Sequence, residues 1–113
     1  MAKAPAGWYP RRGEVYLVSL DKNRPALILS SDFLNRNALD VCVVPITSVH
    51  HGRFALRVAI PRGEGGLIHN SWAKCDQVTT LEKHDVAYPP LGRLSETTLA
   101  KIEDGVRLAL QLT

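Results

Sequence analysis

The C-terminal segment differs in kind from everything before it, and this contrast limits the folds open to the chain. Between residues 93 and 112, apolar residues recur at helical spacing and form one face: Leu99, Ile102, Val106, Ala109 and Leu110. Ser95 is a suitable N-cap and Glu96 supplies an acidic first turn, which favours a helix start at this point. The pattern predicts one amphipathic helix from about residue 96 to residue 112.

Short strand patterns occupy the chain before this helix. Runs rich in Val, Ile, Leu and Tyr are separated by Gly, Pro, Asn and Asp, which is typical of strands joined by turns. The predicted strands cover residues 14–20, 25–30, 41–46, 54–60, 67–74 and 77–81. The 41–46 run is the most apolar and is therefore expected in the centre of the sheet, whereas Tyr88-Pro89-Pro90 is expected to break the chain.

The order of these elements predicts a fold class. Several short strands followed by one amphipathic helix indicate a mostly β protein with α, in which the helix packs on a small antiparallel barrel or strongly coiled sheet. At 113 residues the chain is expected to form a single domain, residues 1–113. Residues 1–10 are rich in proline and small side chains, and we expect them to be a flexible tail.

Composition narrows the setting in which the protein works. The longest apolar runs are far too short to cross a membrane, so we predict a cytoplasmic protein with no membrane contact. The spacing of Cys42 and Cys75 fits neither a zinc site nor a disulfide framework, so we expect two buried thiols, no metal and no cofactor. A net charge of +3 permits nucleic acid as a partner without requiring it.

Five segments, taken together and in order, resemble one protein family. They are RRGEVYLVSL (residues 11–20), RPALILS (24–30), VVPITS (43–48), KCDQVTTL (74–81) and GRLSETTLAKIEDGVRLAL (92–110). In these segments the chain resembles the MazF/PemK/Kid toxins of bacterial type II toxin–antitoxin systems.

The resemblance carries expectations about fold and activity. It implies an SH3-like barrel of about five to seven antiparallel strands with a C-terminal helix, working as a homodimer. It also implies metal-independent, sequence-specific cleavage of single-stranded RNA such as mRNA, and a cognate antitoxin protein as partner. One departure concerns the loop between the first two strands, which is longer in the family and is here reduced to Asp21-Lys22-Asn23.

Three residues are the expected catalytic groups. Metal-free cleavage by the 2′-hydroxyl, which leaves a 2′,3′-cyclic phosphate, needs positive charge at phosphorus together with an acid and a base. Arg24 suits the first role, because its guanidinium is a fixed fork of donors that stays charged. The resemblance also assigns Thr47 to the scissile phosphate and Asp76 to the active site. Without the family resemblance, the simplest interpretations are a surface arginine for Arg24, a turn cap for Thr47 and one half of a surface ion pair for Asp76.

Five further residues are the expected RNA-binding groups: Ser48, His51, Arg53, Lys74 and Gln77. Ser48 follows Thr47 in the family's Thr-Ser pair. Lys74 stands where one branch of the family has arginine, so it keeps the charge but loses the bidentate fork. His51 has a side chain suited to acid–base work, although a solvated loop residue is the simpler interpretation.

Two other functions stay open on the sequence alone. CcdB shares this fold and poisons DNA gyrase without catalysis, so fold by itself does not decide between a nuclease and a gyrase poison. The short first loop also leaves open a catalytically decayed, RNA-binding barrel. The RPALILS and PITS segments favour the ribonuclease.

Overall fold

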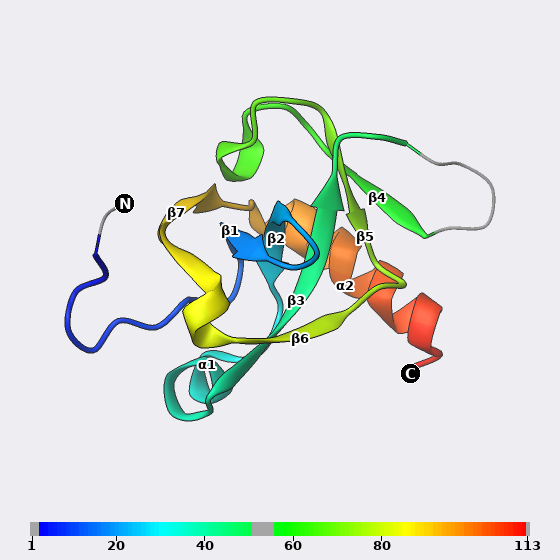
Figure 1. Ribbon diagram of the computed structural model, residues 1–113. Coiled ribbons are helices and arrows are strands. Elements are labelled where there is room, and N and C mark those ends of the chain that lie inside the picture. Colours follow the sequence, from blue (N-terminus) through cyan, green and yellow to red (C-terminus); the bar gives the residue numbers. More distant parts are fainter. Residues whose placement is uncertain (1–2, 51–55, 113) are drawn as a thin grey trace.

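The computed structural model describes residues 3–50 and 56–112 and consists of a curled antiparallel sheet with one long helix against it (Figure 1). The seven strands are β1 (Glu14–Ser19), β2 (Asn23–Ile28), β3 (Asp40–Thr47), β4 (Arg57–Ile60), β5 (Ser71–Lys74), β6 (Thr79–Glu82) and β7 (Val86–Arg93). The helices are α1 (Asp32–Asn37) and α2 (Glu96–Leu110), with 3₁₀ turns η1 (Glu64–Gly66) and η2 (Lys83–Asp85). The predicted mostly β fold with a C-terminal helix is confirmed.

Strand β3 is the centre of the sheet, as its apolar sequence predicts. The strand order is β4-β5-β3-β2-β1-β7, and β6 also pairs with β3. On one edge of β3, β6 pairs with residues 40–43 and β5 with residues 46 and 47. Pro45 lies where β3 changes partner, so its missing N–H costs no ladder bond on that edge. This explains why the strand continues past a proline.

Both faces of the sheet are covered in its central part. Residues on one face pack toward α2, and this cluster includes Val15, Leu27, Val44 and Ile46. Their direct neighbours in the chain point to the other face and form a second cluster, which includes Tyr16, Val18, Ala26, Ile28 and Val43. Because alternate side chains enter different cores, the strands read as continuous apolar runs rather than as alternating patterns.

Helix α2 crosses the sheet at a point where only glycine fits. Ser95 caps the helix through its hydroxyl, which accepts from the Thr98 N–H at 3.2 Å. One face carries Ile102 and Val106 into the core. A Cβ at Gly105 would lie 2.7 Å from the Cys75 Sγ and 3.1 Å from a Val58 methyl carbon. The glycine therefore lets the helix approach β4 and β5 closely, at a cost in helix propensity of about 1 kcal/mol.

We expect Gly105→Ala to destabilise the protein, even though alanine is the better helix former. The gain in propensity is about 1 kcal/mol, whereas overpacking a filled core costs about 1–3 kcal/mol. Chemical denaturation of Gly105→Ala, Cys75→Ala and the double variant measures the coupling between the two sites. In the Cys75→Ala background the clash with sulfur is gone, so Gly105→Ala should turn neutral or stabilising. A gain in stability in the unaltered background would contradict this account.

The strand β7 was missed by the sequence analysis, because Pro89 and Pro90 indicate a chain break. Strand β7 nevertheless continues through both prolines, because its hydrogen-bond ladder with β1 is irregular there. Val15 pairs with Gly92 and Leu17 pairs with Ala87, so Tyr16 alone stands opposite residues 88–91. The prolines sit in this bulged stretch, where no ladder N–H is required of them.

Several element boundaries differ from the prediction by a few residues. Strand β4 is Arg57–Ile60, and residues 54 and 55 of its predicted span lie outside the described residues. Strand β5 begins at Ser71 rather than at residue 67, and α2 ends at Leu110. Residues 64–66 form the turn η1 against β7, where a Cβ on Gly66 would lie 1.9 Å from the Leu91 carbonyl oxygen. Because residue 66 is glycine, the loop after β4 packs directly against β7, the strand at the other end of the sheet order.

Both cysteines are free thiols, as expected, but only one is fully buried. Cys75 is buried in the core beneath α2, and this burial raises the pKa of its thiol to about 11. Cys42 is half-buried on β3. Over residues 3–50 and 56–112, neither helix is long and apolar enough to cross a bilayer.

The flexibility expected for residues 1–10 stays a prediction. In the described part of that segment, Pro10 is buried and Trp8 packs against the second core cluster. The contacts of Trp8 with Tyr16 and Tyr88 place the segment beside β1 and β7.

Candidate functional site

A groove of about 530 Å³ lies where β2 begins and β3 ends. Ala26 pairs with Pro45 in the β2–β3 ladder. Extending this antiparallel register by two residues places Arg24 opposite Thr47, and both side chains line the groove together with Ser48. Three of the predicted site residues, which are far apart in sequence, are thus brought to one surface hollow.

Arg24 is held by an acidic neighbour in its own hairpin. Its Nε and one terminal nitrogen donate to the two carboxylate oxygens of Asp21 at 3.1 and 3.3 Å. The hydrogen bond from Arg24 lowers the pKa of the Asp21 carboxyl below its usual value. The guanidinium thus already grips a carboxylate in the two-pronged geometry that a phosphate would also accept. The short Asp21–Asn23 turn is what places this carboxylate within reach.

Thr47 organises the loop that follows β3 as well as lining the groove. Its hydroxyl oxygen accepts from the Val49 N–H at 3.1 Å, which is the turn-capping role that Thr often takes. Ser48 is exposed beside it. Thr47 therefore caps a turn and also lines the groove, while its contact with a scissile phosphate stays a prediction.

The opposite wall of the groove comes from the loop between η1 and β5. This wall includes Leu67, Ile68 and His69, and Leu17 and Leu91 complete the apolar part of the lining. His69 is not among the site residues predicted from the sequence. It is exposed, but it lines the same groove as Arg24 and Thr47. Nothing in the local sequence marks it, because only the return of the chain through β4 and β5 brings it there.

The described residues that line this groove do not include Lys74, Asp76 or Gln77. These three residues lie at the turn between β5 and β6, where the Gln77 N–H donates to the Lys74 carbonyl oxygen at 3.0 Å. The Asp76 carboxylate accepts from Arg57 at 2.6 Å. The Arg57 side chain is 8% exposed and that of Asp76 is 40% exposed. The charge of the nearly buried guanidinium is therefore paired by a carboxylate that is half exposed to solvent.

Two predicted RNA-binding residues, His51 and Arg53, lie outside the described residues. The residue before them, His50, is described and contacts Trp72, with ring centroids 5.0 Å apart. Trp72 pairs with Thr47 across the β3–β5 ladder. An aromatic pair therefore lies next to the end of β3 that carries Thr47 and Ser48.

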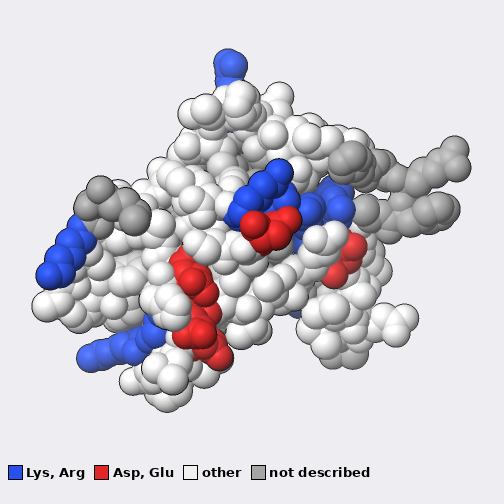
Figure 2. Space-filling model, in the orientation of Figure 1, with Lys and Arg blue, Asp and Glu red and all other residues white. Residues whose placement is uncertain are grey.

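The charges of the described surface are mixed rather than uniformly basic. Figure 2 shows basic side chains near the centre of this face directly beside acidic ones, with neutral surface around them. The ion pairs Arg24–Asp21 and Arg57–Asp76 are two such neighbours. Within residues 3–50 and 56–112, no group of three or more His, Cys, Asp or Glu side chains is arranged to hold a metal ion.

Comparison with known proteins gives one consistent family. A sequence model described as the PemK-like, MazF-like toxin of type II toxin–antitoxin systems matches residues 11–110. The protein named endoribonuclease MazF9 from Mycobacterium tuberculosis is 29% identical over 115 residues, covering 90% of this chain and 97% of that protein.

Solved structures agree with this result. A mycobacterial endoribonuclease in complex with its cognate antitoxin is 30% identical, with a TM-score of 0.81, and the match covers 92% of this chain and 97% of that one. The M. tuberculosis toxin MazF-mt6 is 27% identical with a TM-score of 0.79, and the match covers 88% and 98% of the two chains. The matches span nearly the whole length of each relative.

Proposed function

Because the chain belongs to the PemK-like, MazF-like toxins of type II toxin–antitoxin systems, we propose that it is an endoribonuclease that cleaves single-stranded RNA and is neutralised by a cognate antitoxin. Two similar proteins are named endoribonucleases, and one was solved with its antitoxin. These relatives favour RNA cleavage over the alternative of a gyrase poison. The observation that carries the proposal is the meeting of Arg24 and Thr47, from neighbouring strands, in one groove.

The proposed reaction is a transfer at phosphorus that needs no metal. The 2′-oxygen bonds to the adjacent phosphorus as the bond to the 5′-oxygen breaks, which leaves a 2′,3′-cyclic phosphate on the upstream product. Arg24 exchanges Asp21 for the phosphate and stabilises the charge that gathers on its oxygens. Thr47 and Ser48 add hydroxyl donors to the same phosphate. The proton of the 2′-hydroxyl goes to a base, and the departing 5′-oxygen takes a proton from an acid.

Among the described residues, His69 and Asp76 are the two candidates for these proton transfers; His51, whose side chain also suits acid–base work, lies outside them. His69 lines the groove, and histidine side chains exchange protons readily near neutral pH. Asp76 accepts a hydrogen bond from Arg57 at a turn away from the groove. We therefore favour His69 as the proton-transfer residue and keep Asp76 as the alternative. Lys74 and Gln77 would contact RNA that extends past the β5–β6 turn.

Assembly and location complete the proposal. One groove of this size is shallow for a single-stranded substrate, so we propose a homodimer that joins two copies of the groove into a longer surface. An acidic antitoxin segment would compete for it by presenting carboxylates to Arg24, as Asp21 does within the chain. The proposed setting is the cytoplasm, where the RNA substrates are.

Cleavage is expected to persist in EDTA. The purified protein is incubated with a mixed RNA, with and without chelator, and the ends of the products are mapped. Since Arg24 supplies the positive charge at phosphorus, chelation should leave the rate unchanged and the upstream fragments should end in a cyclic phosphate. A strict requirement for Mg²⁺, or fragments ending in a 3′-hydroxyl, would refute the proposed chemistry.

A further inference from the structure

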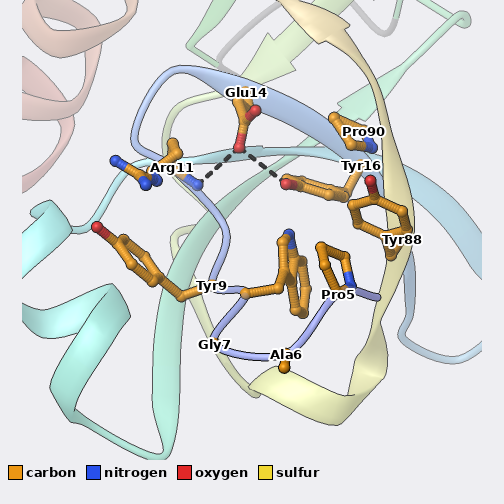
Figure 3. Close-up of a pocket in the computed structure, with 10 residues that line it drawn as sticks. Pro5, Ala6, Gly7, Tyr9, Arg11, Glu14, Tyr16, Tyr88 and Pro90 are labelled. Atoms are coloured by element: carbon orange, nitrogen blue, oxygen red, sulfur yellow. Dashed lines mark hydrogen bonds between the residues drawn. The ribbon is translucent and has the colours of Figure 1, made fainter. Parts of the chain in front are cut away.

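A second pocket, of about 350 Å³, lies between the N-terminal segment and the strands β1 and β7. Figure 3 shows Tyr16, Tyr88 and Pro90 on one side of it, Tyr9 and Arg11 on the other, and the chain from Pro5 to Gly7 closing it from below. Residues 5–9 precede the first residue that the family comparison matches, which is residue 11. The pocket therefore depends on a part of this chain outside the matched family region.

Four of the ten residues that line the pocket are aromatic: Trp8, Tyr9, Tyr16 and Tyr88. The Trp8 ring lies 5.9 Å from that of Tyr16 and 5.7 Å from that of Tyr88, at interplanar angles of 69° and 79°. Both contacts are edge-to-face, so the three rings do not cover one another as a stack would. Tyr16 is buried, so the rings that a flat molecule could reach are those of the half-buried Trp8, Tyr9 and Tyr88.

Polar groups fix these walls in place. One oxygen of the Glu14 carboxylate accepts from the Tyr16 hydroxyl at 2.8 Å and from the Arg11 backbone N–H at 2.7 Å. Burial, together with this bond to Glu14, raises the pKa of Tyr16, so the phenol stays a proton donor. The Arg11 guanidinium lies 4.2 Å from the centre of the Tyr9 ring, and its side chain is exposed at the rim. A cation thus stands beside a preformed aromatic pocket.

Shared lining residues link the pocket to the groove that holds Arg24. A third hollow, of about 660 Å³, shares Leu17 and Asn23 with that groove and shares Trp8 and Tyr88 with the aromatic pocket. The three hollows follow one another along β1. A polymer lying in the groove beside Arg24 can therefore continue past Asn23 and Leu17 to Tyr88 and Trp8.

We propose that the aromatic pocket binds one unpaired base of the RNA substrate, at a distance from the bond that is cut. Stacking on aromatic side chains is the common way in which proteins hold single-stranded nucleic acid, and it tolerates any base because every base has a flat π face. Arg11 at the rim would pair with the phosphate of the same nucleotide. This inference rests on the proposed function and adds a substrate contact that lies outside the matched family region.

The test uses tryptophan fluorescence, since the chain has two tryptophans and Trp72→Phe leaves Trp8 as the single reporter. A labelled 2′-O-methyl oligoribonucleotide of mixed sequence serves as the probe, because it lacks the free hydroxyl needed for cleavage. Anisotropy of the label reports binding to the whole protein, and quenching of Trp8 reports occupation of the pocket. We expect both signals to saturate over the same range of protein concentration.

Affinity measurements sharpen the test. Trp8→Ala should weaken binding of a long oligonucleotide by roughly 5–100-fold, because base–aromatic stacking contributes about 1–3 kcal/mol per base and 1.4 kcal/mol is tenfold. Arg11→Ala should weaken it less. Phe33→Ala is the matched control, since this aromatic ring is 74% exposed on α1 and lines none of the three hollows among the described residues. It should leave the affinity unchanged.

The outcomes separate this inference from the proposed function. Binding by anisotropy without quenching of Trp8, or with full affinity in Trp8→Ala, would overturn the pocket's role and leave RNA recognition by the groove intact. Absence of any binding would remove the basis of the proposed function itself. A response of Trp8 to an acidic, apolar peptide but not to the oligonucleotide would reassign the pocket to a protein partner and overturn the inference.

Discussion

Arg24→Ala is expected to lower the rate of RNA cleavage by about 10²–10³-fold, the scale for removing one preorganised donor from a developing negative charge. Arg24 lines the groove opposite Thr47, and its two-pronged contact with Asp21 shows that it can hold an oxygen pair. The fold should survive, because an exposed ion pair of this kind contributes little to stability. Single-turnover cleavage and thermal unfolding measure the two effects separately.

Two companion variants give this experiment its controls. Arg24→Lys keeps the charge but loses the fork, so it should recover only part of the lost rate. Arg107→Ala is the matched control, because Arg107 also forms an i,i+3 pair with an aspartate but lies on α2, away from the groove. Normal cleavage by Arg24→Ala, or a large loss of stability, would show that the arginine has a structural role instead.

Asp76→Asn is expected to lower the free energy of unfolding by about 1–3 kcal/mol, because it leaves the nearly buried Arg57 guanidinium without its carboxylate. The figure stays below the range for a fully buried pair, because Asp76 is 40% exposed and solvent can take over part of the interaction. The Nε of Arg57 has no hydrogen-bond partner among the described residues, so the side chain has little else to rely on. Denaturant unfolding gives the loss directly.

The same variant decides between the two candidates for proton transfer. If Asp76 only anchors Arg57, folded Asp76→Asn should cleave RNA at nearly the normal rate. The double variant Arg57→Met/Asp76→Asn should then regain stability, since an apolar side chain can replace a buried ion pair. If the cleavage rate falls as far as in Arg24→Ala and the double variant does not restore it, Asp76 is the catalytic base and His69 is not needed for that role.

The short turn between β1 and β2 links these results. The family resemblance implies a longer loop there, one that helps to grip RNA. In this chain the turn is Asp21-Lys22-Asn23, and its acidic residue is bonded to Arg24. In our proposals, two other parts of this chain replace the RNA contacts of the longer loop: the groove residues around His69 and the aromatic pocket beside Trp8.

The sequence by itself determined the elements whose signals are local. Helical spacing and the Ser95 cap defined α2 to within two residues at its C-terminal end. The apolar runs located β1, β2 and β3, because a strand buried on both faces leaves an unmistakable run of Val, Ile and Leu. The RPALILS and PITS segments also pointed to Arg24, Thr47 and Ser48, which line the same groove in the structure.

Only the tertiary structure decided how distant residues combine. Strand β7 was hidden by its prolines, since the bulge that accommodates them exists only once β1 pairs with it. Gly105 lowers the helix propensity of α2, and only the close approach of Cys75 in the folded chain explains why glycine occupies this position. His69 and Trp8 carry no local signal, yet one lines the groove beside Arg24 and the other forms the wall of a pocket. Hydrophobic periodicity can be read from residues that are close together in the sequence. A functional site instead depends on strand register and on the paths of the loops, because these bring together residues that are far apart in the sequence.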